Sequence, residues 1–184
     1  MTKLFLSLHV LAAVLAIGPV AVAASMFPAA LRRAHGASAA GAPGDRDALA
    51  NLRMLHRVCR VYAAVGTAVP VLGFVTADSL GVLGSGWLIV SIVLTTAAAA
   101  VLALLILPGQ DAALIALQEQ EQEQEQEPEP ERGPGPVPGP GPGPGSGHAA
   151  RSAARLAMLT GVFNLLWATV TVLMIIRPGS TTGA

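Results

Sequence analysis

Charged residues, aromatic residues and cysteine are all scarce in this sequence. Only 12% of its 184 residues are charged and 4% are aromatic, whereas 53% are hydrophobic. A soluble domain carries about 25% charged residues, so the composition is typical of a membrane protein. The single cysteine, Cys59, excludes an intramolecular disulfide and a four-thiolate zinc site.

The sequence also lacks the motifs of soluble enzymes. It contains no phosphate-binding loop, nucleophile elbow, zinc-protease helix or dinucleotide fingerprint, so we assign no catalytic residue. The net charge is zero, and nine of the eleven Lys and Arg fall in two stretches, while seven of the eleven acids lie between Glu119 and Glu131. This segregation argues against a soluble nucleic-acid-binding protein.

Long uncharged runs dominate the chain. Leu4–Phe27 contains no Asp, Glu, Lys or Arg and as a helix would reach about 36 Å, enough to cross a hydrocarbon core of ~30 Å. Ala21-Val22-Ala23 resembles a signal-peptide cleavage site, but the apolar run continues past it and an Arg-rich stretch follows, so we expect a retained span. Three later runs predict further spans, at Val61–Ala77, Trp87–Leu107 and Leu156–Ile176.

These runs predict an all-α protein, a four-helix transmembrane bundle, with kinks at Gly18-Pro19 and Pro70. We expect residues 1–107 to hold three membrane helices, with an Arg-rich cytoplasmic loop at 28–60. Residues 108–150, first rich in Gln and Glu and then in Pro and Gly, are expected to be a disordered cytoplasmic loop. A Pro-rich ligand for a partner domain is the alternative for this insert. Residues 151–184 hold the fourth helix and a short tail.

The distribution of basic residues predicts the orientation. The two long loops carry nine Lys and Arg, against two on the other side of the membrane. Cytoplasmic loops carry the excess, so both termini are expected to be extracytoplasmic. The arginines also suit anionic lipid headgroups. The abundance of Ala, Gly, Pro and Arg favours a bacterial origin, and hence the plasma membrane.

Short motifs in the first and last spans carry a resemblance. Leu8-His9-Val10-Leu11 followed by Gly18, together with the stretch 173–179 (LMIIRPG), resembles a group of small bacterial four-helix membrane proteins of unknown function. These proteins are loosely similar to the copper-resistance D membrane domain and to the protoporphyrinogen-oxidase-like membrane family. In the haem- and metal-handling relatives, histidines within the helices are the functional groups. The resemblance therefore implies a cofactor-binding role for His9, with haem or copper as the cofactor.

His9 is also a candidate on physical grounds. An ionisable residue within a membrane span is costly to bury, and a neutral imidazole can bind a metal or relay a proton. The alternative is a histidine hydrogen-bonded to a neighbouring threonine or backbone carbonyl. Thr76 and Asp78 are expected at a similar depth.

Other polar residues predict helix packing or a metal site. Thr160 and Asn164 share one face of the fourth span, and Ser91 and Thr95 lie on a small-residue ridge of the third; such residues join helices in membranes. Soft sulfur and imidazole ligands suit Cu(I), so one hypothesis is a metal site formed by three residues at the start of the second span: Met54, His56 and Cys59.

Taken together, the sequence favours a small integral membrane protein without enzymatic activity, acting as a structural or accessory subunit. Its expected partners are the lipid bilayer and either further copies of itself or another membrane subunit. Two alternatives remain: a haem- or copper-handling protein that uses His9, and a small transporter, which the kinked helices suggest.

Overall fold

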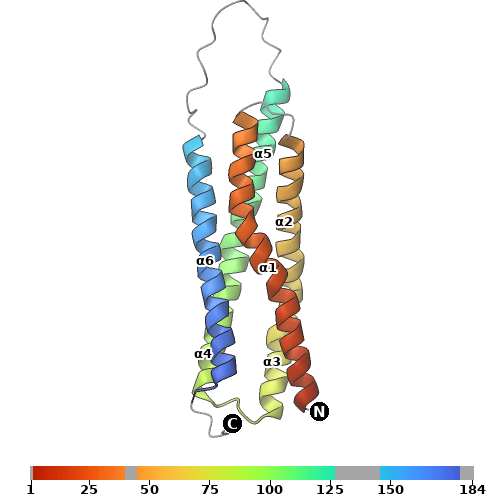
Figure 1. The fold of residues 1–184 in the computed structure, drawn as a ribbon, viewed down its shortest axis with the longest axis vertical. Helices are drawn as coiled ribbons and strands as arrows, with labels where there is room; N and C mark the ends of the chain where they lie inside the picture. The colour runs from red at the N-terminus through yellow and green to blue at the C-terminus, as the bar shows by residue number, and fades with distance from the viewer. Residues whose placement is uncertain (1, 40–44, 127–145, 179–184) are drawn as a thin grey trace, which may run out of the picture.

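The computed structural model describes residues 2–39, 45–126 and 146–178, and every regular element in this part is helical. In chain order the elements are α1 (Thr2–Ala39), α2 (Asp45–Gly66), α3 (Ala68–Ser79), α4 (Gly86–Val101), the π-helix η1 (Leu102–Ile106), α5 (Leu107–Gln126) and α6 (Ser146–Ile176). They form four rods, because α2 continues into α3 and α4 continues through η1 into α5 (Figure 1). All four rods are long and apolar enough to cross a membrane, which confirms the predicted all-α class with four membrane-length helices.

The rods lie side by side, with the start of α1, the end of α6 and the α3–α4 turn at one end of the molecule (Figure 1). We call the half next to this end the apolar half, since its rods carry no charge between their end and the level of Arg60 and Arg155. The other half, which we call the arginine half, holds most of the charges. The arginine half consists of residues 28–39, 45–60, 107–126 and 146–155.

In the apolar half the rods pack mainly as two pairs. There α1 packs against α3, and α4 packs against α6, while α1 also contacts α6 near the middle of the bundle. Only 11% to 28% of the residues in the most apolar window of each rod are buried. Large apolar side chains such as Val14, Val71 and Leu165 are more than 60% exposed. This surface suits hydrocarbon rather than water.

The arginine half has an apolar core of its own. Phe27 and Leu31 of α1, Leu52 of α2, Leu114 of α5 and Leu156 of α6 are members of one buried cluster. A second cluster continues the core toward the middle of the apolar half, through residues such as Ala24, Cys59, Ile106 and Phe163. The bundle therefore stays closely packed beyond the level at which the rods become charged.

Two stretches predicted as loops are largely helical. Within the predicted loop 28–60, the helical stretch of α1 at 28–39 was not expected, whereas α2 begins at Asp45, one of the two residues at which the sequence favours the start of the second helix. The predicted disordered stretch 108–150 is helical at 108–126 and 146–150, and its residues 127–145 lie outside the described part. In the first of these two ends, Ala113, Leu114 and Leu117 join the core of the arginine half, which holds that end in a helix.

The prolines act as predicted in the second rod. Helix α2 ends at Gly66 and α3 begins at Ala68, because Pro70 has no N–H to donate to the Gly66 carbonyl four residues earlier. Thr67 fills the break by donating both its backbone N–H and its hydroxyl to the carbonyl of Ala64. In contrast, α1 runs through Pro19 and Pro28 as one helix, and its direction changes between its two halves (Figure 1).

Candidate functional site

A buried polar network joins α2 to α5 where the apolar and arginine halves meet. His56 is 7% exposed and Gln110 is 1% exposed. Nδ1 of His56 lies 3.0 Å from Oε1 of Gln110, and the Gln110 amide nitrogen donates to Sγ of Cys59 at 3.7 Å. A buried polar group is costly without a partner, so these contacts stabilise the α2–α5 interface.

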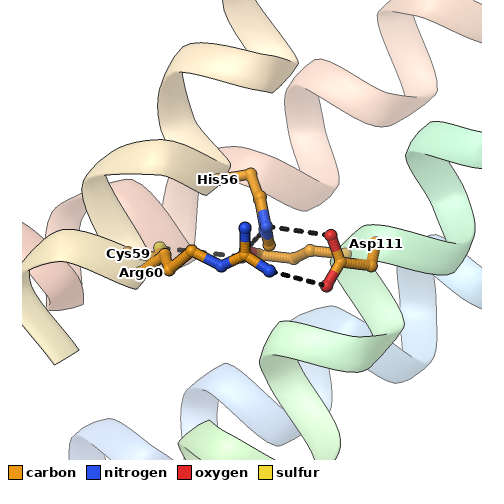
Figure 2. Close-up of polar contacts among 5 residues, drawn as sticks. His56, Cys59, Arg60 and Asp111 are labelled. Atoms are coloured by element: carbon orange, nitrogen blue, oxygen red, sulfur yellow. Dashed lines mark hydrogen bonds and ion pairs between the residues drawn. The ribbon is translucent and has the colours of Figure 1, made fainter. Parts of the chain in front are cut away.

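Asp111 faces the other ring nitrogen of the same histidine. Its Oδ1 lies 3.0 Å from Nε2 of His56, and its Oδ2 lies 3.9 Å from Nη2 of Arg60 (Figure 2). The Nε2 contact has the spacing of an ion pair but not the alignment of a hydrogen bond. Both ring nitrogens thus face oxygen atoms of α5 side chains. Arg60 is 69% exposed, so its pairing with Asp111 contributes at most about 1 kcal/mol.

The π-helical turn η1, which precedes Gln110 and Asp111 in the chain, determines which residues of α5 face α2. Pro108 cannot donate to a carbonyl of the preceding turn, and η1 accommodates it: the N–H of Leu107 donates to the carbonyl of Leu102, five residues earlier. One extra residue in a turn rotates the following residues by about 100°. In the resulting register Leu102, Ile106 and Gln110 are all buried.

His9 occupies a second polar site, between α1 and α3. It is 8% exposed, and its Nδ1 lies 3.0 Å from the backbone oxygen of Val69. Because a carbonyl only accepts, Nδ1 carries the hydrogen, and Nε2 keeps its lone pair. His9 therefore forms the hydrogen bond to a backbone carbonyl that the sequence analysis gave as one alternative. The carbonyl belongs to Val69, and not to a residue of the Thr76–Asp78 region.

The described residues do not place His9 in a group of three or more metal-binding side chains. Its imidazole packs directly against Gly73, so that even a methyl group at position 73 would be too close to the ring. Within residues 2–39, 45–126 and 146–178, no group of three His, Cys, Asp or Glu side chains could hold a metal ion.

The residues of the predicted copper site are not brought together. Met54 is 66% exposed, whereas His56 and Cys59 are buried. Gln110 lies between the imidazole and the thiol and contacts both. Sequence reasoning found His56 and Cys59 but missed Gln110, Asp111 and Arg60 as their partners. One feature of the sequence could have indicated these partners. Gln110 and Asp111 are the first strongly polar residues after the third apolar run.

The predicted packing residues have different roles. Thr160 donates to the Ala24 carbonyl at 3.4 Å, and the amide nitrogen of Asn164 donates to Oγ of Ser25 at 3.2 Å, so both join α6 to α1. Ser91 is fully buried but donates to the Trp87 carbonyl within its own helix. Thr95 is half-buried on α4.

Comparisons with protein-family models, with curated protein sequences and with solved structures found no match to this chain.

Proposed function

We propose that this protein is a multi-pass protein of the bacterial plasma membrane that acts, without enzymatic activity of its own, as a structural or accessory subunit. The observation that carries the proposal is the apolar core of the arginine half. Helices need no such core within a bilayer, because hydrocarbon solvates their apolar side chains. Outside the bilayer, burial of Leu31, Leu52 and Leu114 holds the helix ends together in water and creates a fixed surface for a partner.

The charge distribution supports a cytoplasmic position for this surface. Of the described Lys and Arg residues, only Lys3 and Arg177 lie at the end of the molecule that holds the start of α1 and the end of α6. The excess of arginine at the opposite end favours the cytoplasmic side for that end. Both termini are then extracytoplasmic.

The exposed apolar half supports the bilayer as one partner. A second partner can bind to the same exposed surface. Another copy of this chain, or a different membrane subunit, would then replace part of the lipid around the apolar half. The buried network of His56, Gln110 and Asp111 lies between the two halves and ties α2 to α5. In this proposal the network holds the cytoplasmic surface in place relative to the membrane.

The test is the composition of the complex formed in native membranes. The tagged chain is extracted in mild detergent and its molar mass is measured by light scattering, with the polypeptides identified and quantified. We expect a particle heavier than one chain that contains either a stoichiometric second polypeptide or additional copies. Leu52→Ala should weaken this complex by opening a cavity in the arginine-half core, whereas Met54→Ala, at an exposed neighbouring position, should not.

A single-chain particle without a stoichiometric partner would contradict the proposal. Further measurements would then decide between the two alternative functions. The visible spectrum and the metal content are compared between the wild type and a His9→Ala variant. A haem band or stoichiometric copper that the variant loses would indicate a cofactor-handling protein. A thermal transition that rises with a particular solute would indicate a transporter.

A further inference from the structure

One face of the second rod combines three exposed arginines with an exposed apolar surface. Arg53, Arg57 and Arg60 follow one another at spacings of four and three residues, which places them on one face of α2. All three are exposed. The same face continues into the apolar half through small and medium apolar residues that are also exposed: Ala64, Ala68, Val71 and Val75. We call these seven residues the α2–α3 stripe.

The arginines of the stripe are spread over the depth of a lipid headgroup layer. Arg60 is the last charged residue before the uncharged run of 61–77, so it lies where hydrocarbon begins. Arg53 lies seven residues earlier, about 10 Å farther from the hydrocarbon. The headgroup region on each side of a bilayer is about 5–8 Å thick. The three guanidinium groups therefore reach from the hydrocarbon boundary through the phosphate level.

No acid on the same rod lies between these arginines. Asp45 and Asp47 stand at the start of α2 and Asp78 near the end of α3. Asp111 of α5 approaches Arg60 only at 3.9 Å and faces His56 with its other oxygen. The guanidinium groups thus keep hydrogen-bond donors for a phosphate, which arginine binds in a bidentate manner.

We propose that the α2–α3 stripe is a binding site for an anionic phospholipid. The phosphate contacts Arg53, Arg57 and Arg60, and the acyl chains lie along the apolar part of the stripe. The arginine end of the stripe complements the charge of the lipid phosphate, and its apolar end matches the acyl chains. A free phosphate has no acyl chains and would leave the apolar end of the stripe without a ligand. The inference rests on the membrane placement in the proposed function, but not on the accessory role.

The test compares lipids and variants on the purified full-length chain in mild detergent. Binding of dioleoyl phosphatidylglycerol and of dioleoyl phosphatidylcholine is measured by native mass spectrometry and by the shift of the thermal transition. We expect the anionic lipid to bind more tightly. Two arginines near an anionic headgroup contribute ~1 kcal/mol each, so Arg53→Gln/Arg57→Gln should weaken phosphatidylglycerol binding about 30-fold. Arg60 is left in place because it also contacts Asp111.

The matched control removes the same charge from another helix. Arg151→Gln/Arg155→Gln changes two exposed arginines of α6 and should change binding less than about threefold. Equal losses in both double variants, or no preference of the wild type for phosphatidylglycerol, would overturn the proposal. So would an equal thermal shift with inorganic phosphate, since the ligand would then be a free anion. A complex that lacks a partner subunit, but keeps this lipid preference, would contradict only the accessory role.

Discussion

Gly73 of α3 lies against the imidazole of His9 on α1. A Cβ atom at position 73 would be 3.0 Å from Cε1 and 3.4 Å from Nδ1 of the ring, closer than side chains normally approach. The ring cannot move away freely, because its Nδ1 is bonded to the carbonyl of Val69. The absence of a side chain at position 73 therefore makes the contact between α1 and α3 possible.

Gly73→Ala is expected to lower the free energy of unfolding by about 1–2 kcal/mol, since overpacking displaces the ring. In a His9→Ala background the same change should be neutral or stabilising, because alanine favours the helix and the obstacle is gone. Thermal unfolding in detergent measures both. Gly66→Ala is the control, because its Cβ would meet only Ala16, at 3.9 Å. Equal costs in both backgrounds would show that His9 does not restrict position 73.

Gln110→Leu is expected to destabilise the protein by about 1–3 kcal/mol. The variant removes the oxygen that faces Nδ1 of the buried His56 and leaves that nitrogen without its partner. Gln122→Leu, at an exposed position of the same helix, should change stability by less than about 0.5 kcal/mol. A chemical or thermal unfolding curve of each variant gives the comparison. Matching curves would show that the α2–α5 network contributes nothing.

Asn164→Leu is expected to cost about 0.6 kcal/mol, the average for a polar contact between membrane helices. The cost is small because the variant loses one bond to Ser25 but also removes a buried oxygen, Oδ1, that has no partner. Ser25→Ala should add little further cost to Asn164→Leu, since both substitutions remove the same bond between helices and the other bond of the Ser25 hydroxyl goes to Ala21 within its own exposed helix turn. An additive double variant, measured by thermal unfolding, would contradict this pairing.

The proposed orientation predicts where a thiol reagent can reach. Cys59 is buried and is first replaced by serine, and single cysteines are then placed at two exposed sites, Ser79 and Ser152. A membrane-impermeant maleimide should label Ser79→Cys in intact cells, and Ser152→Cys only after the membrane is permeabilised. The reverse pattern would place the termini in the cytoplasm.

The membrane-length helices could be predicted from sequence because a bilayer imposes one simple requirement. A run such as Leu4–Phe27 without a charge can satisfy its backbone only as a helix. The break before Pro70 follows equally simply from the missing N–H. In contrast, Phe27, Leu52 and Leu114 belong to segments separated by long stretches of sequence. No local pattern shows that they share one core, and the helical stretch at 28–39 was therefore missed.

The partners in the polar network were also beyond sequence reasoning. Which residues of α5 face His56 depends on the extra residue in η1, and a π-helical turn has no reliable signature of its own. A regular α-helix drawn through Leu102–Ile106 would turn Gln110 away by about 100°. Sequence analysis could place His56 and Cys59 on one face of α2, but not the amide that lies between them.

The uncharged stretches of the four rods differ in length, and this has a consequence for the surrounding bilayer. The run 61–77 of α2–α3 covers about 26 Å along the helix, whereas the run 86–110 of α4–α5 covers about 37 Å. A flat hydrocarbon layer of one thickness cannot match both. In the proposed membrane placement this difference is taken up by tilt of the rods, by snorkelling of Arg60 or by a local change in bilayer thickness beside one of the two rods.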